Sequence, residues 1–193
     1  IFTASGSSSP VTITGLTEGQ TYTTTITAIN AYGPSGISAA SNSVEAEDLA
    51  GELWTWGYNA EGQLGQGNGT VQSSPVQVGA LSTWLQLTAG YQFQILHKTD
   101  GTLWSVGIND VGQLGVNTGT AAYSSLIQVG ALTDWTTEIG AGRSHFSAIK
   151  SDGTLWAFGS NGNGRLGTGN TTTYSSPVQI GALTTWSKIS CGD

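Results

Sequence analysis

The chain has 193 residues, of which 9% are charged, and its formal net charge is −7 at pH 7. Ordinary soluble domains carry about 25% charged residues, so the surface must consist mainly of Thr, Ser, Asn, Gln and Gly. An acidic chain with five Lys and Arg residues repels polyanions, which argues against a nucleic-acid partner. The single cysteine, Cys191, excludes an intramolecular disulfide, and no run of 18 apolar residues predicts insertion into a membrane.

The first 48 residues differ from the rest because they contain no Trp, Lys or Arg. Within them TYTTTITAIN (21–30) alternates Thr with Tyr or Ile, which predicts a half-buried antiparallel strand. Together with GLTEGQTY (15–22) and a Ser-rich run, it is similar to the last three strands of a fibronectin type III domain. The resemblance implies antiparallel strands over 11–46, with Tyr22 buried as a tyrosine corner. It also implies that only the C-terminal part of such a sandwich is present.

Three copies of one unit follow, with a period near 50 residues. Their Trp motifs are GELW at 51–54, GTLW at 101–104 and GTLW at 153–156, and the intervening blocks also recur. The units contain short runs rich in β-branched and aromatic residues, and no window has the 3.6-residue period of a helix. The runs around the middle copy predict four short strands at 127–130, 136–142, 146–150 and 154–159.

The turns and the facing of side chains indicate how these strands assemble. Asp-Gly at 100–101 and at 152–153 lies between strand-like runs and predicts hairpin turns. In the strand after the first turn, Trp104 and Val106 face one way and Leu103 faces the other. A sheet that is apolar on both faces must be covered on both. Stacked four-stranded sheets with this period are typical of a β-propeller.

The segment AGRSHFSAIKSDGTLWAFGSNGNGRLGTG (141–169) closely resembles the regulator-of-chromosome-condensation repeat. The resemblance covers 51–193 and implies that glycines let strands and loops pass close together, while Trp and Leu fill the space between blades. The fold class is therefore all-β: a partial fibronectin type III-like sandwich in 1–48, then an incomplete β-propeller of four-stranded blades in 49–193. With about 2.75 repeat copies, we expect the segment to come from a longer protein.

No catalytic constellation is visible in the sequence. The GxSxG, GxxxxGK[ST], CxxC and DxDxDG motifs are all missing. His97 and His145 fall at different repeat positions, so they form no paired ligand set. His145 stands where the family has a structural histidine, and core histidines bonded to backbone are expected. Asp100 and Asp152 belong to turns. We therefore predict a non-enzymatic protein without a metal or cofactor site.

The variable parts of the repeat remain for binding. The segments 65–72, 115–123 and 167–174 occupy matching places but differ in sequence, as expected of the rim loops through which propellers bind. Their amide and aromatic groups suit contacts to a sugar or a protein, and a second variable pair follows the AG motif. The candidate partner-binding residues are Asn68, Asn117, Tyr123, Asn170 and Tyr174 in the loops, and Tyr91 and Arg143 after the AG motif. Solvated loops without a ligand are the alternative.

Three classes of function compete. The favoured one is a surface-exposed binding or adhesion protein, extracellular on a cell or virion, either a bacterial secreted protein or a phage tail fibre. It would recognise a glycan or protein, within a larger homo-oligomeric or virion assembly. A purely structural spacer is its alternative. The family's eukaryotic namesake suggests a chromatin-bound exchange factor for a small GTPase, which the acidic charge and the sandwich neighbour disfavour. An enzyme is the third class, and no constellation supports it.

Overall fold

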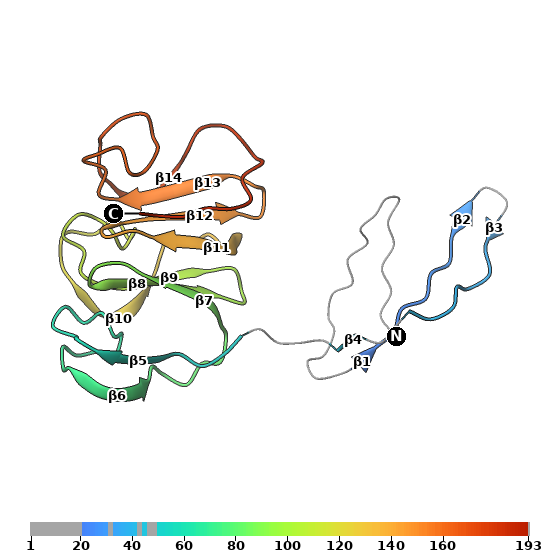
Figure 1. Cartoon of the computed structure of the whole chain (residues 1–193), viewed down its shortest axis with the longest axis horizontal. Coiled ribbons are helices and arrows are strands. Elements are labelled where there is room, and N and C mark those ends of the chain that lie inside the picture. The colour runs from blue at the N-terminus through green and yellow to red at the C-terminus, as the bar shows by residue number, and fades with distance from the viewer. Residues whose placement is uncertain (1–20, 31–32, 42–43, 46–49, 193) are drawn as a thin grey trace. The chain divides into compact units, whose positions relative to one another are not determined.

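The computed structural model describes residues 21–30, 33–41, 44–45 and 50–192. The chain divides into two compact units, Ile1–Leu49 and Ala50–Asp193. Every regular element among the described residues is a β-strand (Figure 1), which confirms the all-β prediction for them. In this part of the chain no helix has the length and apolar character needed to cross a membrane.

The described part of the first unit is made of short antiparallel pairs. β1 (Thr21–Tyr22) pairs with β4 (Val44–Glu45), and β2 (Ile29–Asn30) pairs with β3 (Gly33–Pro34). Between these pairs the two segments are joined by three serines, Ser35, Ser38 and Ser41. Each serine donates its backbone N–H to a carbonyl of the facing segment, and its hydroxyl accepts from the backbone N–H of the same facing residue at 2.9–3.0 Å.

The prediction of a half-buried strand over 21–30 is wrong for its isoleucines. Ile26 and Ile29 are 70% and 80% exposed, and Tyr22 is half-buried rather than buried. The described residues of this unit form only two-stranded sheets, and none of these sheets opposes the isoleucines to cover them. The described residues do not show a fibronectin type III fold, and the segment 11–20 of that prediction lies outside them.

Three antiparallel sheets, stacked one on another in Figure 1, make up the second unit. The first is formed by β5 (Trp54–Gly57) and β6 (Gln72–Gln77). The second has the order β10-β9-β8-β7, with β7 (Trp84–Ala89), β8 (Phe93–Lys98), β9 (Leu103–Gly107) and β10 (Tyr123–Gln128). The third has the order β11-β12-β13-β14, with β11 (Trp135–Ala141), β12 (His145–Lys150), β13 (Leu155–Gly159) and β14 (Tyr174–Gln179). Two of the three sheets thus have four strands each, as predicted for the blades.

The strands are grouped into blades differently from the prediction. The segment 127–130 was expected to share a sheet with 136–159, but it overlaps the end of β10, where Gln128 pairs with Trp104 of β9. The fourth strand of the third sheet is β14, whose Gln179 pairs with Trp156. A periodic sequence looks the same wherever the unit is taken to start, so the sequence pattern could not reveal the boundary. The tryptophans of the repeated motifs, Trp54, Trp104 and Trp156, do occupy equivalent positions, because each pairs with a glutamine on the last strand of its sheet.

Two clusters of buried side chains hold the sheets together. Between the first and second sheets lie Leu53, Val78, Trp84, Leu96 and Val106. Between the second and third lie Phe93, Ile95, Leu103, Leu114, Val129, Trp135, Phe146, Ala148 and Phe158. Alternation along β9 sends Leu103 to one cluster and Val106 to the other, with Trp104 packed beside Val106. The second blade is therefore covered on both faces, as its sequence predicted.

Glycines allow the close approach of loops to the next blade. Gly112 has φ +73°, and a Cβ built there would lie 2.7 Å from the Cα of Ser175 in the third sheet. The equivalent Gly62 would meet Ser124 of the second sheet at 2.4 Å. These contacts agree with the role that the family resemblance implied for the glycines.

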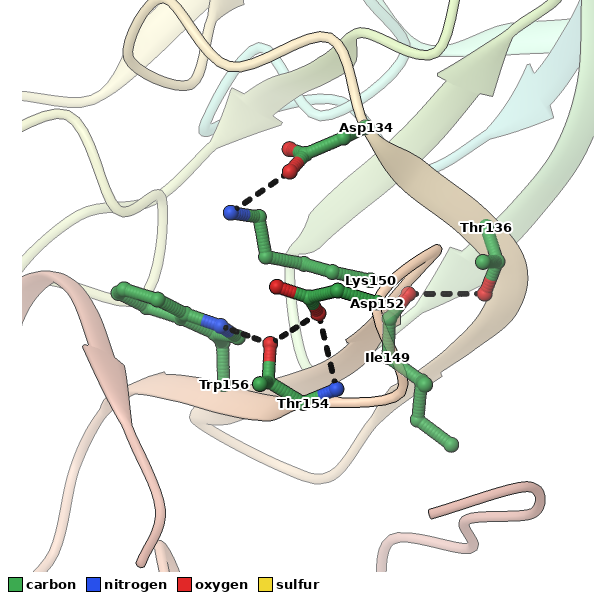
Figure 2. A network of polar contacts seen from close by, with 7 residues as sticks. All are labelled: Asp134, Thr136, Ile149, Lys150, Asp152, Thr154 and Trp156. Carbon is green, nitrogen blue, oxygen red and sulfur yellow. Dashed lines mark hydrogen bonds and ion pairs between the residues drawn. The ribbon is translucent and has the colours of Figure 1, made fainter. Parts of the chain in front are cut away.

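A polar network that recurs in two sheets holds the Asp-Gly turns, and Figure 2 shows it in the third sheet. Asp152 Oδ1 accepts from the backbone N and the hydroxyl of Thr154 at 3.0 and 2.6 Å, and Trp156 Nε1 donates to that hydroxyl at 2.8 Å. The hydroxyl bond holds the pKa of Asp152 below its usual value. The second sheet repeats the contacts at 2.6–3.0 Å among Asp100, Thr102 and Trp104. Both aspartates therefore belong to turns, as predicted.

A lysine lies over tryptophan in each of these networks. Lys150 is 8% exposed, its Nζ lies 4.9 Å from the Trp156 ring centroid, and it pairs with Asp134 Oδ2 at 2.8 Å (Figure 2). Lys98 Nζ lies 4.2 Å from the ring of Trp104 and 4.9 Å from that of Trp84. Cation–π contacts of this kind stabilise the fold, so both lysines serve the scaffold.

Candidate partner-binding face

The order of the strands gathers the predicted binding residues at one end of the sheets. In an antiparallel blade, the turn after the first strand and the loop after the third lie at the same end, because those two strands run in the same direction. We call this end the loop face. It comprises the turns 90–92 and 142–144 and the loops 58–71, 108–122 and 160–173. The opposite end, which carries the Asp-Gly turns, is the hairpin end.

Two of the predicted residues, Tyr91 and Arg143, meet on the loop face. Tyr91 N donates to the Arg143 carbonyl at 2.9 Å, and the Arg143 guanidinium carbon lies 5.3 Å from the Tyr91 ring centroid. Tyr91 is 57% exposed, and Arg143 is exposed as well. The two side chains come from adjacent blades at equivalent positions. They present a flat aromatic group and a planar cation to solvent, the two features that favour protein contacts.

A buried asparagine anchors each long loop. Asn161 Nδ2 donates to the carbonyls of Asn170 and Thr172 at 3.0 and 2.9 Å, and its Oδ1 accepts from Leu166 N at 3.0 Å. Equivalent contacts, each at 3.0–3.1 Å to the loop carbonyls, are made by Asn59 and Asn109. All three are at most 1% exposed. The recurrence of Asn in NAEG, NDVG and NGNG is the signal in the sequence for these three anchors.

The predicted loop asparagines are exposed, but each has a local task. The Oδ1 atoms of Asn68 and Asn170 accept from the backbone N–H two residues later, at 2.9 and 2.8 Å. Asn117 has φ +52°, and its Oδ1 accepts from the Ser175 hydroxyl at 3.1 Å. Asn117 N also donates to the Ser175 carbonyl at 2.8 Å. Asn117 thus joins the loop of the second blade to the third.

The predicted tyrosines Tyr123 and Tyr174 are half-buried at the starts of β10 and β14. Their rings pack against buried clusters, and their hydroxyls turn to the loops. The Tyr123 hydroxyl lies 2.7 Å from Thr118 Oγ1, and the Tyr174 hydroxyl accepts from Asn170 Nδ2 at 3.3 Å. The structure therefore brings the seven predicted residues to one face, with direct side-chain contacts in the pairs Tyr91–Arg143 and Asn170–Tyr174.

Arg165 was not among the predicted residues, yet it also lies on the loop face. With Arg143, Ser144 and Ser160 it lines a hollow of about 340 Å³. Its Nη1 donates to Ser160 Oγ at 3.4 Å. The signal in the sequence was the change from NAEGQLG and NDVGQLG to NGNGRLG, in which an arginine replaces the glutamine of the earlier copies.

The buried titratable groups serve the fold. His97 is 3% exposed, its Nε2 lies 3.0 Å from the Trp135 carbonyl, and burial lowers its pKa, which confirms it as a core histidine. His145 is equally buried. Cys191 is half-buried, and burial raises the pKa of its thiol. Among the described residues, no group of three or more His, Cys, Asp or Glu side chains is placed to hold a metal ion.

Comparison with known proteins identifies the repeat. Two models of the regulator of chromosome condensation (RCC1) repeat match, one at residues 50–96 and 152–193 and the other at 137–165. A probable E3 ubiquitin-protein ligase, HERC4, of Homo sapiens is 49% identical over 45 residues, which are 23% of this chain and 4% of HERC4. The ultraviolet-B receptor UVR8 of Arabidopsis thaliana is 28% identical over 152 residues, 76% of this chain and 34% of UVR8. The chain thus spans at most about a third of these relatives.

Solved structures show the same fold. Prp20p of Saccharomyces cerevisiae superimposes with a TM-score of 0.62 at 19% identity, over 69% of this chain and 35% of Prp20p. Human WBSCR16 gives a TM-score of 0.59 at 21% identity, over 72% of this chain and 35% of WBSCR16. Together the two family models match more than half of the 193 residues. The second unit is a stack of RCC1-like propeller blades, and the chain belongs to the RCC1 repeat family.

Proposed function

We propose that this chain is a non-enzymatic protein-binding module that recognises its partner through the loop face. The main observation behind this proposal is that the two ends of the same blades differ in how far their residues repeat. The hairpin end repeats the Asp, Thr and Trp of its turn and their contacts from the second blade to the third, whereas the loop face places Tyr91 on one blade and Arg143 at the equivalent position of the next. Residues that repeat in successive blades stabilise each blade, whereas residues that differ between blades are available for a specific contact with a partner.

The chemistry of the loop face favours a protein ligand. Tyr and Arg are enriched in protein interfaces, where a planar side chain gives a large contact area. Tyr91 and Arg143 are exposed and restrain each other through the 5.3 Å ring contact. Such mutual restraint lowers the entropy that binding would otherwise remove.

Structural neighbours support the same class of ligand. Prp20p has binding properties toward Gsp1p and histones, and yeast RCC1 (Prp20) has been solved bound to Kap60. This chain covers 35% of Prp20p at 19% identity. We therefore propose only that the ligand of this chain is a protein, and we propose none of these particular partners.

A surface-exposed adhesion role with a glycan ligand is the second candidate, favoured by the charged content of 9%. It places the chain outside the cell or on a virion. A panel of immobilised glycans separates the two candidates, because the protein-binding proposal expects no glycan to compete with the partner.

Site-specific photo-crosslinking tests the proposal. A benzophenone amino acid is placed at Tyr91 on the loop face, or at the exposed Ser151 on the hairpin end as the matched control. In extracts of the source cells, we expect one discrete protein crosslink from position 91 and none from position 151. Equal crosslinking from both positions, or competition by a glycan, would contradict the proposal.

Exchange of loops localises the contact further. Residues 168–174 are replaced by the sequence of 66–72, which has the same length and the same asparagine anchor. We expect the protein to stay folded, with a lower melting temperature because the Tyr174 ring is lost from its cluster, while crosslinking from position 91 falls. Unchanged crosslinking would restrict recognition to the short turns.

A further inference from the structure

We propose that the hollow between Arg143 and Arg165 is a carboxylate-binding site for an acidic segment of the partner protein. This inference rests on the proposed function, because it names the chemistry by which the loop face would hold its partner. The two arginines come from the 142–144 turn and the 160–173 loop of the third blade, and Ser144 and Ser160 complete the lining.

The distribution of positive charge sets this hollow apart. The chain has five Lys and Arg residues. Lys98 and Lys150 lie over tryptophan rings, and Lys188 pairs with Glu138. Within the described ranges, ion pairs form at Lys150 and Lys188 and at neither arginine. The two arginines, neither of which forms an ion pair within these ranges, therefore line one hollow on the loop face of an otherwise acidic protein.

Both guanidinium groups are held in place before a ligand arrives. Arg143 lies over the Tyr91 ring, and Arg165 donates to Ser160 Oγ at 3.4 Å. With the Asn163 amide oriented to satisfy its own bonds, its oxygen accepts from Arg165 Nη2 at 3.1 Å. Ser160 N donates to the Ser144 carbonyl at 2.8 Å, which ties the loop to the turn. Restraint of this kind reduces the entropic cost of binding an anion.

The lining offers donors and no competing carboxylate. Two arginines and two serines line a volume of about 340 Å³, which is enough for a carboxylate and the adjoining chain. Guanidinium groups bind carboxylates through paired hydrogen bonds of matching geometry. A long polyanion would meet the net charge of −7 beyond the hollow, whereas a short acidic segment keeps its charges near the arginines.

Titration of the full chain with defined peptides tests the site. The probe is acetylated tetraglutamate amide, with the tetraglutamine peptide as its uncharged match, and affinity is measured by isothermal calorimetry at low salt. We expect the glutamate peptide alone to bind. Arg143→Gln and Arg165→Gln should each weaken its affinity about tenfold. Arg165→Lys, which keeps the charge but loses the planar fork, should also weaken it, and Lys188→Gln should change it less than twofold.

Several outcomes would overturn the inference. They are equal binding of the two peptides, equal effects of Lys188→Gln and Arg165→Gln, or tighter binding of inorganic phosphate or a thymidine oligonucleotide than of the glutamate peptide. Melting curves of the variants show that each is folded. If the peptide fails to bind while crosslinking from position 91 persists, the inference fails and the protein-binding proposal stands. If crosslinking from position 91 fails while the peptide binds, the protein-binding proposal fails instead.

Discussion

The hairpin end and the loop face are opposite ends of the same strands, but the side chains at the tips of the loop-face turns differ between successive blades. At the hairpin end, Asp100 and Asp152 hold their turns through the same threonine contacts at 2.6–3.0 Å. At the loop face, the turns present Tyr91 in one blade and Arg143 in the next. Identical contacts in successive blades mark what folding requires of each blade. Side chains that differ on an otherwise repeated frame are those that can change without loss of the blade.

The largest difference in unfolding free energy between structural and exposed positions should appear when a core side chain is truncated to alanine. Phe146 is fully buried between the second and third blades, with its ring 4.9 Å from that of Phe158. Phe146→Ala should cost about 3–5 kcal/mol, because a cavity remains in a packed core. Tyr91→Ala should cost at most about 0.5 kcal/mol, as exposed substitutions usually do. Chemical denaturation measures both, and similar losses would mean that Tyr91 is structural.

A pair of equivalent glycines measures the blade-to-blade contact on the loop side. Gly112 and Gly164 both have φ +73°, but a Cβ at Gly112 would meet Ser175 Cα at 2.7 Å, while nothing lies within 4 Å at Gly164. The left-handed backbone costs alanine about 1–2 kcal/mol at either position. Gly112→Ala should therefore cost about 2–4 kcal/mol in all, and Gly164→Ala only the backbone part. Equal unfolding free energies for the two variants would remove the close contact as a cause.

A smaller effect is expected from the hydroxyl that joins Asp152 to Trp156. Thr154→Val removes both hydroxyl bonds and should cost about 1–2 kcal/mol, with a rise in the pKa of Asp152 because the donor that lowers it is lost. Thr118→Val on the exposed loop face is the matched change and should cost about 0.5 kcal/mol or less. Denaturation gives the stability, and NMR titration of the carboxyl carbons gives the pKa. An unchanged pKa in Thr154→Val would contradict the assigned network.

The smallest effect concerns pH. Burial lowers the pKa of His97 in the folded protein, against a favourable bond to the Trp135 carbonyl and the nearby Asp100. The unfolded state therefore binds more protons, so this stability is present above about pH 6.5 and is lost as the pH falls toward the folded pKa. The unfolding free energy should drop between about pH 7.5 and 5. His97→Gln, which can keep the bond to the carbonyl, should show a smaller drop, and an identical drop would assign the titration elsewhere.

Local patterns in the sequence predicted the blades because the determinants are local. Alternation over 103–106 was enough to predict a sheet buried on both faces, and Asp-Gly was enough to place the hairpin turns. The start of the blade was mispredicted because the identity of the fourth strand depends on a pairing across a long loop. In the first unit, alternation over 21–30 indicated burial that the described residues do not provide, since burial depends on an opposing sheet.

The candidate site was only half predictable. Tyr91 and Arg143 could be found because they break the repeat at the same position. Their contact depends on the stacking of two blades, which no local pattern encodes. Arg165 breaks the repeat too, in a segment where the glycine pattern drew attention to the scaffold, and its place beside Arg143 follows only from the shared end of the strands.

Tolerance to substitution at the two ends of the blades is the most direct measurement of their division of roles. Every residue type is introduced at 98–104 and 150–156 of the hairpin end and at 91–92, 143–144 and 168–172 of the loop face, and surface-displayed variants are sorted for protease resistance. We expect most substitutions at the loop-face positions to leave the protein resistant, with the glycine at 169 excepted because its φ is +77°. Most substitutions of Asp, Thr and Trp at the hairpin end should make the protein sensitive. Equal sensitivity of the two sets would contradict the claim that the loop face is free for recognition.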